Sequence, residues 1–72
     1  MGHLVTTGGE LTSREREVLA MLAEGQRANE IAARLGLSVA TVRNHIRGVL
    51  RKLGCHSQLE AVAESRRRGL LT

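Results

Sequence analysis

The chain has 72 residues, a formal net charge of +4, one cysteine and no Phe, Tyr or Trp. A chain of this length forms one small domain. A single thiol excludes a framework of disulfides. The lack of aromatic rings argues against modules that bind single-stranded nucleic acid by stacking its bases on such rings. The positive charge favours an anionic partner, for which nucleic acid is the leading candidate and a merely solvated basic surface the alternative.

The first ten residues, MGHLVTTGGE, show no hydrophobic period and contain three glycines. This composition is typical of a flexible lead-in, either the end of a linker or the remnant of a tag. We therefore expect residues 1–10 to precede a single folded domain over residues 11–72.

The first helix is predicted over about residues 13–24. Thr12-Ser13-Arg14-Glu15 has the capping-box pattern, in which the hydroxyl of Thr12 and the carboxylate of Glu15 satisfy each other's backbone N–H groups. The apolar residues that follow at helical spacing are Val18, Leu19, Met21 and Leu22. Gly25 suits the position after the helix. We expect Glu15 to serve this cap and a nearby basic side chain rather than acid–base chemistry.

A second, short helix is predicted over about residues 28–35. The side chains expected to face inward are Ile31, Ala32 and Leu35. Gly36 supplies a left-handed residue that ends the helix, and Ser38 is a good N-cap for the next one. A small Ala32 at the helix crossing and Val42 on the inner face beyond the turn complete the spacing of a helix-turn-helix.

The third helix is predicted over about residues 39–53 and has two contrasting faces. The apolar stripe consists of Val42, Ile46, Val49, Leu50 and Leu53. The opposite side carries Ala40, Asn44, Arg47, Gly48 and Arg51, with Arg43 at its edge. The small residues at 40 and 48 are expected to allow close approach to a groove.

Charge singles out this part of the chain. No Asp or Glu occurs between Ile31 and Leu59. The fixed positive charges in that segment are Arg34, Arg43, Arg47, Arg51 and Lys52. Arginine pairs with guanine and asparagine with adenine in the major groove. A half-apolar, half-cationic helix held by a short partner helix is the layout of a helix-turn-helix DNA-binding module, so the sequence predicts an all-α fold of this type.

The fourth helix is predicted over about residues 58–68. Ser57 and Glu60 form a second capping-box pattern. The apolar face is thin and consists of Leu59, Ala61, Val62 and Ala63. Three arginines, residues 66–68, lie where cations favour the negative end of a helix, and Leu70-Leu71 is expected to fold back on the first helix.

In these residues the chain resembles the C-terminal DNA-binding domain of LuxR-type (GerE-type) bacterial transcription regulators. The residues that carry the resemblance are Leu11-Thr12-Ser13-Arg14-Glu15, Val18-Leu19, Gly25, Asn29-Glu30-Ile31-Ala32, Leu35, Ser38, Thr41-Val42, His45, Lys52-Leu53-Gly54 and Glu60-Ala61-Val62. The resemblance extends over about residues 11–71. It implies a four-helix domain whose third helix enters the major groove of double-stranded DNA and whose fourth helix forms the homodimer contact on DNA.

The resemblance also implies roles for individual residues. The base-contacting positions fall on Arg43, Asn44 and Arg47. The phosphate-contacting positions fall on Arg27, Asn29, Ser38, Thr41, Arg51 and Lys52. The dimer contact falls on Leu59, Val62, Ala63 and Arg66. His45, at the edge of the apolar stripe, is expected to pack or to position the third helix.

Other classes of function fit less well. A module resembling region 4 of σ factors, which docks mainly on RNA polymerase, remains an alternative. An enzyme is not expected, because the chain has no Asp and no nucleophile paired with a separate base. Neither cofactor nor metal is expected, since His3, His45 and His56 have no ligand spacing with the thiol. With no apolar run of membrane-spanning length and no signal peptide, a bacterial cytoplasmic location at the nucleoid is expected, without membrane or small-molecule partners.

Overall fold

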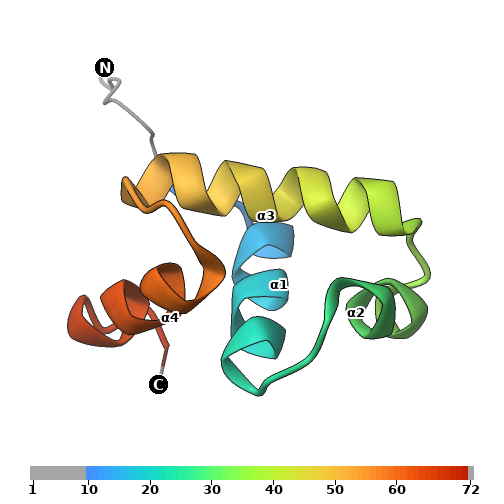
Figure 1. The fold of residues 1–72 in the computed structure, drawn as a ribbon, viewed down its shortest axis with the longest axis horizontal. Helices are drawn as coiled ribbons and strands as arrows, with labels where there is room; N and C mark the ends of the chain where they lie inside the picture. Colours follow the sequence, from blue (N-terminus) through green and yellow to red (C-terminus); the bar gives the residue numbers. More distant parts are fainter. Residues whose placement is uncertain (1–9, 72) are drawn as a thin grey trace.

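The computed structural model describes residues 10–71, so the lead-in predicted over residues 1–10 lies outside the described residues apart from Glu10. The described part of the chain contains four helices and no strand, as predicted. They are α1 (Ser13–Ala23), α2 (Ala28–Leu35), α3 (Val39–Leu53) and α4 (Gln58–Arg67). Figure 1 shows α3 lying across one side of the molecule with the other three helices beneath it. None of these helices is long and apolar enough to cross a membrane.

The helix ends follow from local capping. Thr12 and Glu15 form the predicted reciprocal cap, with N···O distances of 2.9 and 3.1 Å. Ser38 accepts from the Thr41 N–H at 3.0 Å. Gly36 adopts φ 68°, in the left-handed region, and its N–H donates to the Ala32 carbonyl. Because these signals are local, the bounds of α2 and α3 agree with the sequence prediction, and α1 and α4 each end one residue earlier than predicted.

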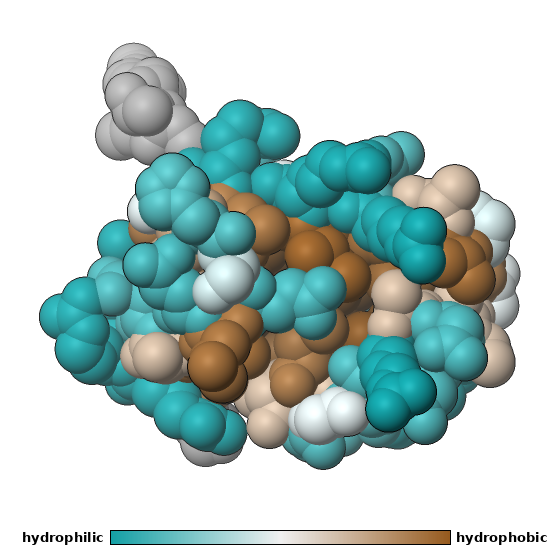
Figure 2. Space-filling model, in the orientation of Figure 1, coloured by the Kyte–Doolittle hydropathy of each residue, from teal (hydrophilic) through white to brown (hydrophobic). Residues whose placement is uncertain are grey.

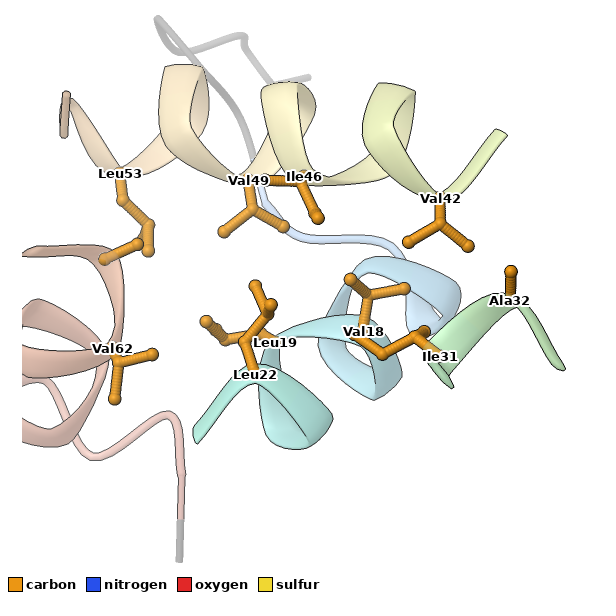
Figure 3. Packing of buried hydrophobic residues seen from close by; sticks show 11 residues of the cluster. Val18, Leu19, Leu22, Ile31, Ala32, Val42, Ile46, Val49, Leu53 and Val62 are labelled. Atoms are coloured by element: carbon orange, nitrogen blue, oxygen red, sulfur yellow. The ribbon is translucent and has the colours of Figure 1, made fainter. Parts of the chain in front are cut away.

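The core lies between α3 and the other three helices, because α3 contacts α1, α2 and α4. In Figure 3 one side of α3 points toward all three partners. The buried hydrophobic residues are Val18, Leu19, Leu22, Ile31, Ala32, Val42, Ile46, Val49, Leu53, Ala61 and Val62. Leu50, predicted to belong to the stripe, lies at its edge and is only partly buried against this cluster. Burial of this side of α3 therefore turns the opposite side toward solvent.

Helix α4 buries only part of its predicted apolar face. The buried residues are Ala61, Val62 and Ser65, whereas Leu59 is 82% exposed and Ala63 is exposed. The hydroxyl of Ser65 donates to the Ala61 carbonyl at 2.6 Å, which satisfies this polar group within the helix. The predicted cap of α4 is only half formed. The Ser57 hydroxyl accepts from the Glu60 N–H, but the Glu60 carboxylate accepts from the N–H of His56 instead of from Ser57.

The residues that follow α4 also contact the core. Leu70 and Leu71 are partly buried and pack against the hydrophobic cluster. They line a hollow together with Ala20 and Ala23 of α1, which agrees with the predicted return to the first helix. Arg68 donates to the Leu53 carbonyl at 3.3 Å and so links the end of α4 to the last turn of α3. Arg67 and Arg68 also pair with Glu64 one turn earlier. These two arginines of the predicted cationic run are therefore engaged within the domain.

Candidate nucleic-acid interface

An exposed arc, polar except at Ala40, runs along the outer side of α3. We define the basic arc as the exposed residues Ala40, Arg43, Asn44, Arg47 and Arg51. At about 100° per residue these side chains occupy about 100° of the helix surface, opposite the buried stripe. In Figure 2 the outer edge of α3 is hydrophilic over most of its length, and hydrophobic residues appear at the end where the helix begins. The structure thus brings the predicted base-contacting residues, Arg43, Asn44 and Arg47, together on one solvent-facing strip.

Two residues of the basic arc, Asn44 and Arg47, are hydrogen-bonded to each other. The guanidinium of Arg47 donates from Nη1 to Oδ1 of Asn44, one turn earlier, at 2.9 Å. Both side chains are exposed. Their i,i+3 spacing places them next to each other on the helix surface. The two groups are therefore a hydrogen-bonded pair and not, as their place in the sequence suggested, two independent positions.

Gly48 does not belong to this arc, contrary to the prediction that it opens the helix to a groove. It is buried, and a Cβ atom at this position would clash with Oε2 of Glu15 in α1. At about 140° from Arg43, Gly48 lies just beyond the exposed strip, where α1 covers α3. Its small size therefore permits contact between two helices of the domain.

Glu15 joins the start of α1 to the end of α3. Its Oε1 accepts from the ammonium of Lys52 at 2.8 Å and from the N–H of Thr12 at 2.9 Å. The side chains are only 9% and 17% exposed for Glu15 and Lys52. Burial raises the pKa of Glu15, but the hydrogen bonds from Lys52 and Thr12 outweigh it, so the net shift is downward from 4.5. The predicted basic partner of Glu15 is therefore Lys52.

The remaining predicted phosphate-contacting residues cluster at two helix starts and on the basic arc. Arg27 and Asn29, at the start of α2, are exposed. The carboxylate of Glu30 accepts from the Arg27 N–H at 2.7 Å and supports this helix start, a role the sequence analysis missed. At the start of α3, the Ser38 hydroxyl donates to Thr41 Oγ1 at 2.9 Å. Helix N-termini attract anions through their free N–H groups.

The predicted dimer residues lie on the outer face of α4. Leu59, Ala63 and Arg66 are exposed, and Val62 is 9% exposed at the edge of the core. Leu59 and Val62 line a groove of about 630 Å³ whose other wall is the α1–α2 connection around Leu22 and Ala28. Figure 2 shows hydrophobic side chains gathered on the face between α3 and α4, framed by hydrophilic ones. On this face, the large apolar side chain of Leu59 is therefore exposed to solvent.

Gln58 is a polar neighbour of the basic arc that sequence reasoning missed. It begins α4 and lines, with Arg43, Ile46 and Arg47, a hollow of about 220 Å³. Nothing in the local pattern could have identified it, because the approach of α4 to the arc depends on the path of the chain after α3.

Three other polar residues, His45, Cys55 and Glu64, interact mainly with the rest of the domain. His45 is half-buried, in keeping with the predicted packing role. Burial raises the pKa of the Cys55 thiol, with the carboxylates of Glu60 and Glu64 adding to the shift, so this thiol is less readily ionised than a free one. Hydrogen bonds from Arg68 and Arg67 lower the pKa of Glu64.

Comparison with known proteins agrees with this geometry. Residues 9–65 match the family described as "Bacterial regulatory proteins, luxR family". The spore germination protein GerE of Bacillus subtilis is 46% identical over 61 residues, which are 85% of this chain and 82% of GerE. The transcriptional regulatory protein DesR of the same organism is 39% identical over 69 residues, 96% of this chain but 35% of DesR. For the activator RamA of Corynebacterium glutamicum the chain spans 22% of the relative.

Solved structures give the same result. The transcription factor GerE superposes with a TM-score of 0.81, 39% identity and coverage of 86% of this chain and 92% of that one. VqmA of Vibrio cholera, solved in a complex with a ligand and DNA, superposes with a TM-score of 0.80 and 30% identity, covering 97% of this chain and 31% of that one. The resemblance predicted from the motifs is confirmed: the chain belongs to the luxR family of bacterial regulatory proteins, as its four-helix DNA-binding domain of helix-turn-helix type.

Proposed function

We propose that this domain is the output module of a bacterial transcription regulator, and that the basic arc of α3 contacts base edges in the major groove of double-stranded DNA. The observation that carries the proposal is the basic arc itself: an exposed strip of arginine and asparagine on a segment without carboxylates. Arginine and asparagine side chains of this length reach base edges from a helix seated in the groove. Arg43, Asn44 and Arg47 would supply the discrimination between sequences.

Contacts to the DNA backbone would supply most of the affinity. The residues proposed for these contacts are Arg27, Asn29, Ser38, Thr41, Arg51 and Lys52. The exposed starts of α2 and α3 suit phosphate oxygens because free N–H groups and polar side chains meet there. Lys52 differs from the others, since its ammonium already pairs with Glu15. Its contribution would come from the donors that this ion pair leaves unused.

The domain would pair with a second copy on DNA through α4. The support is the 82% exposure of Leu59 beside Val62, Ala63 and Arg66, because a large apolar side chain in water gains free energy by burial against a partner. Two copies would then occupy half-sites about one helical turn apart. As the ligand is genomic DNA, the domain would act in the bacterial cytoplasm, at the nucleoid.

The test is an in-vitro selection by the 72-residue chain from a random duplex library at about 150 mM salt, where specific binding is meaningful. Affinity for the enriched site and for a scrambled duplex is then measured against salt. We expect an enriched repeat bound at least about 10³-fold more tightly than the scrambled control. Weak, equal binding to both duplexes would contradict the proposal and favour the alternative, docking on RNA polymerase with DNA contacts secondary.

A further inference from the structure

We propose that Asn44 acts as a positioning residue for Arg47, and that the two side chains form one recognition unit whose target is guanine. This inference rests on the proposed function, because it assumes that α3 enters the major groove. It goes beyond that function by assigning a base and by giving Asn44 a task different from the adenine contact that its side chain suggests on its own.

The first argument is the orientation of the amide. A guanidinium has only N–H donors and no acceptor, so the Asn44 atom that faces Arg47 must be the oxygen. The Nη1···Oδ1 distance of 2.9 Å is that of a good hydrogen bond, and the positive charge of the donor strengthens it. Contact with Arg47 therefore selects one of the two amide orientations and turns the NH₂ group of Asn44 away from the arginine.

The second argument is the direction in which Arg47 extends. Helical side chains lean toward the N-terminus of their helix, and the bond to a residue one turn earlier holds the guanidinium there. Residues in the N-terminal part of a recognition helix contact base edges. Released from Asn44, the long side chain of Arg47 would be free to turn toward the phosphates instead. The hydrogen bond thus restricts the side chain of Arg47 before DNA binds. Less side-chain conformational entropy is then lost when Arg47 contacts a base.

The third argument is the chemistry that the pair presents. Recognition of adenine by Asn needs a donor for N7 and an acceptor for the N6 amino group. In this pair the Asn44 oxygen is held toward Arg47 and uses one of its two lone pairs there, while the N–H groups of Arg47 outside this bond remain donors. Such a set of donors matches guanine, whose major-groove edge offers the two acceptors O6 and N7.

The experiment compares the base preferences of variants on the site selected by the unmodified chain. Arg47→Ala first identifies the base pair that Arg47 contacts, as the pair whose preference is lost. We expect this pair to contain guanine, with a preference of roughly 5- to 150-fold over other pairs. Asn44→Ala is then expected to weaken the preference at the same pair. Replacing that guanine by 7-deazaguanine, which lacks the N7 acceptor, should weaken the unmodified chain but leave Arg47→Ala unchanged.

A double-mutant cycle separates positioning from independent contact. If Asn44 acts through Arg47, the variant with both alanine substitutions binds about as tightly as Arg47→Ala alone. The matched control is the same cycle with Arg43→Ala, because adjacent helical residues do not face each other, and there the losses should multiply. Asn44→Asp keeps an oxygen acceptor, so the preference at the guanine pair should be retained even as the added negative charge lowers affinity for every duplex.

The outcomes distinguish this inference from the function on which it rests. If Asn44→Ala relaxes a different base pair, or if its loss multiplies with that of Arg47→Ala, the pairing is overturned while the DNA-binding function stands. The same holds if Arg47 selects a pair without guanine. If the unmodified chain enriches no sequence, both proposals fail together.

Discussion

The carboxylate of Glu15, in the first turn of α1, lies against the backbone of Gly48 in the middle of α3. The same carboxylate accepts from Lys52 one turn further along α3. Since α3 also carries the basic arc, this contact helps to set the rotation of the arc about the helix axis. Glu15 and Gly48, which help to orient α3, are thus not among the residues proposed to contact DNA, whereas Lys52 belongs to both groups.

Gly48→Ala is expected to destabilise the domain by about 1–3 kcal/mol, the usual result of overpacking. At an exposed helix position the same substitution would stabilise the helix by about 1 kcal/mol. The reason for the expected loss is that the added Cβ meets Oε2 of Glu15, and displacement of this carboxylate would disturb the hydrogen bond that its other oxygen, Oε1, accepts from Lys52. Urea unfolding measures the change. In a Glu15→Ala background the same substitution should be neutral or stabilising, and an equal loss in both backgrounds would refute the explanation.

Lys52→Met is expected to lower the free energy of unfolding by about 1–3 kcal/mol, because it leaves the largely buried Glu15 carboxylate without its charged partner. The control is Arg14→Met, which removes an ion pair with Glu17 whose side chains are 41% and 54% exposed. An exposed pair contributes at most about 1 kcal/mol. Thermal unfolding of both variants provides the comparison, and similar losses would show that burial of the Lys52 pair has no special importance.

Acid is expected to weaken the domain through Glu15. Its pKa in the folded state lies below the ordinary value of 4.5, so the unfolded chain binds more protons in this range and stability rises with pH. The contribution of Glu15 is fully present above pH 4.5 and is lost as the pH falls through the lowered pKa. Urea unfolding across this window should show a steeper decline for the unmodified chain than for Glu15→Gln. Glu64 also has a lowered pKa, so only the difference between the two curves tests Glu15.

Two arginines of the basic arc are expected to respond differently to removal. Arg47→Ala should reduce discrimination at one or two base pairs by about 1–3 kcal/mol, since a base contact distinguishes sequences. Arg51→Ala should weaken binding to all duplexes alike and reduce the salt slope by about one unit, as the loss of a phosphate contact does. Affinities for the selected and scrambled duplexes at several salt concentrations measure both effects. Equal losses of Arg47→Ala on the two duplexes would rule out its base contact.

Leu59→Asp is expected to weaken binding to a duplex with two half-sites while leaving binding to a single half-site nearly unchanged. Because Leu59 is 82% exposed, its replacement should not disturb the fold, and the loss would arise where two copies meet. Leu59→Asn separates lost apolar contact from added charge repulsion. The ratio of affinities for the two duplexes is the measurement, and an unchanged ratio would argue against pairing through α4.

The local features of the fold follow from the sequence alone. The caps at Thr12 and Ser38 and the left-handed Gly36 act within a few residues of themselves, so the bounds of α2 and α3 could be predicted to the residue. The 3.6-residue period likewise assigned Arg43 and Arg47 to the exposed side of α3. The second capping box was only partly right, since Glu60 had two backbone N–H groups within reach and a sequence pattern does not distinguish them.

Only the tertiary structure decided which residues lie at the boundary between faces. Gly48 lies at the margin of the exposed strip and was expected to face a groove. Because α1 covers this part of α3, Gly48 instead contacts Glu15 of α1. Lys52 pairs with a residue 37 positions away, and Leu59 is left outside a core that its own helix helps to form. Periodicity describes each helix by itself. The way helices cover one another depends on contacts between segments far apart in the chain, and neither periodicity nor local motifs reveal these contacts.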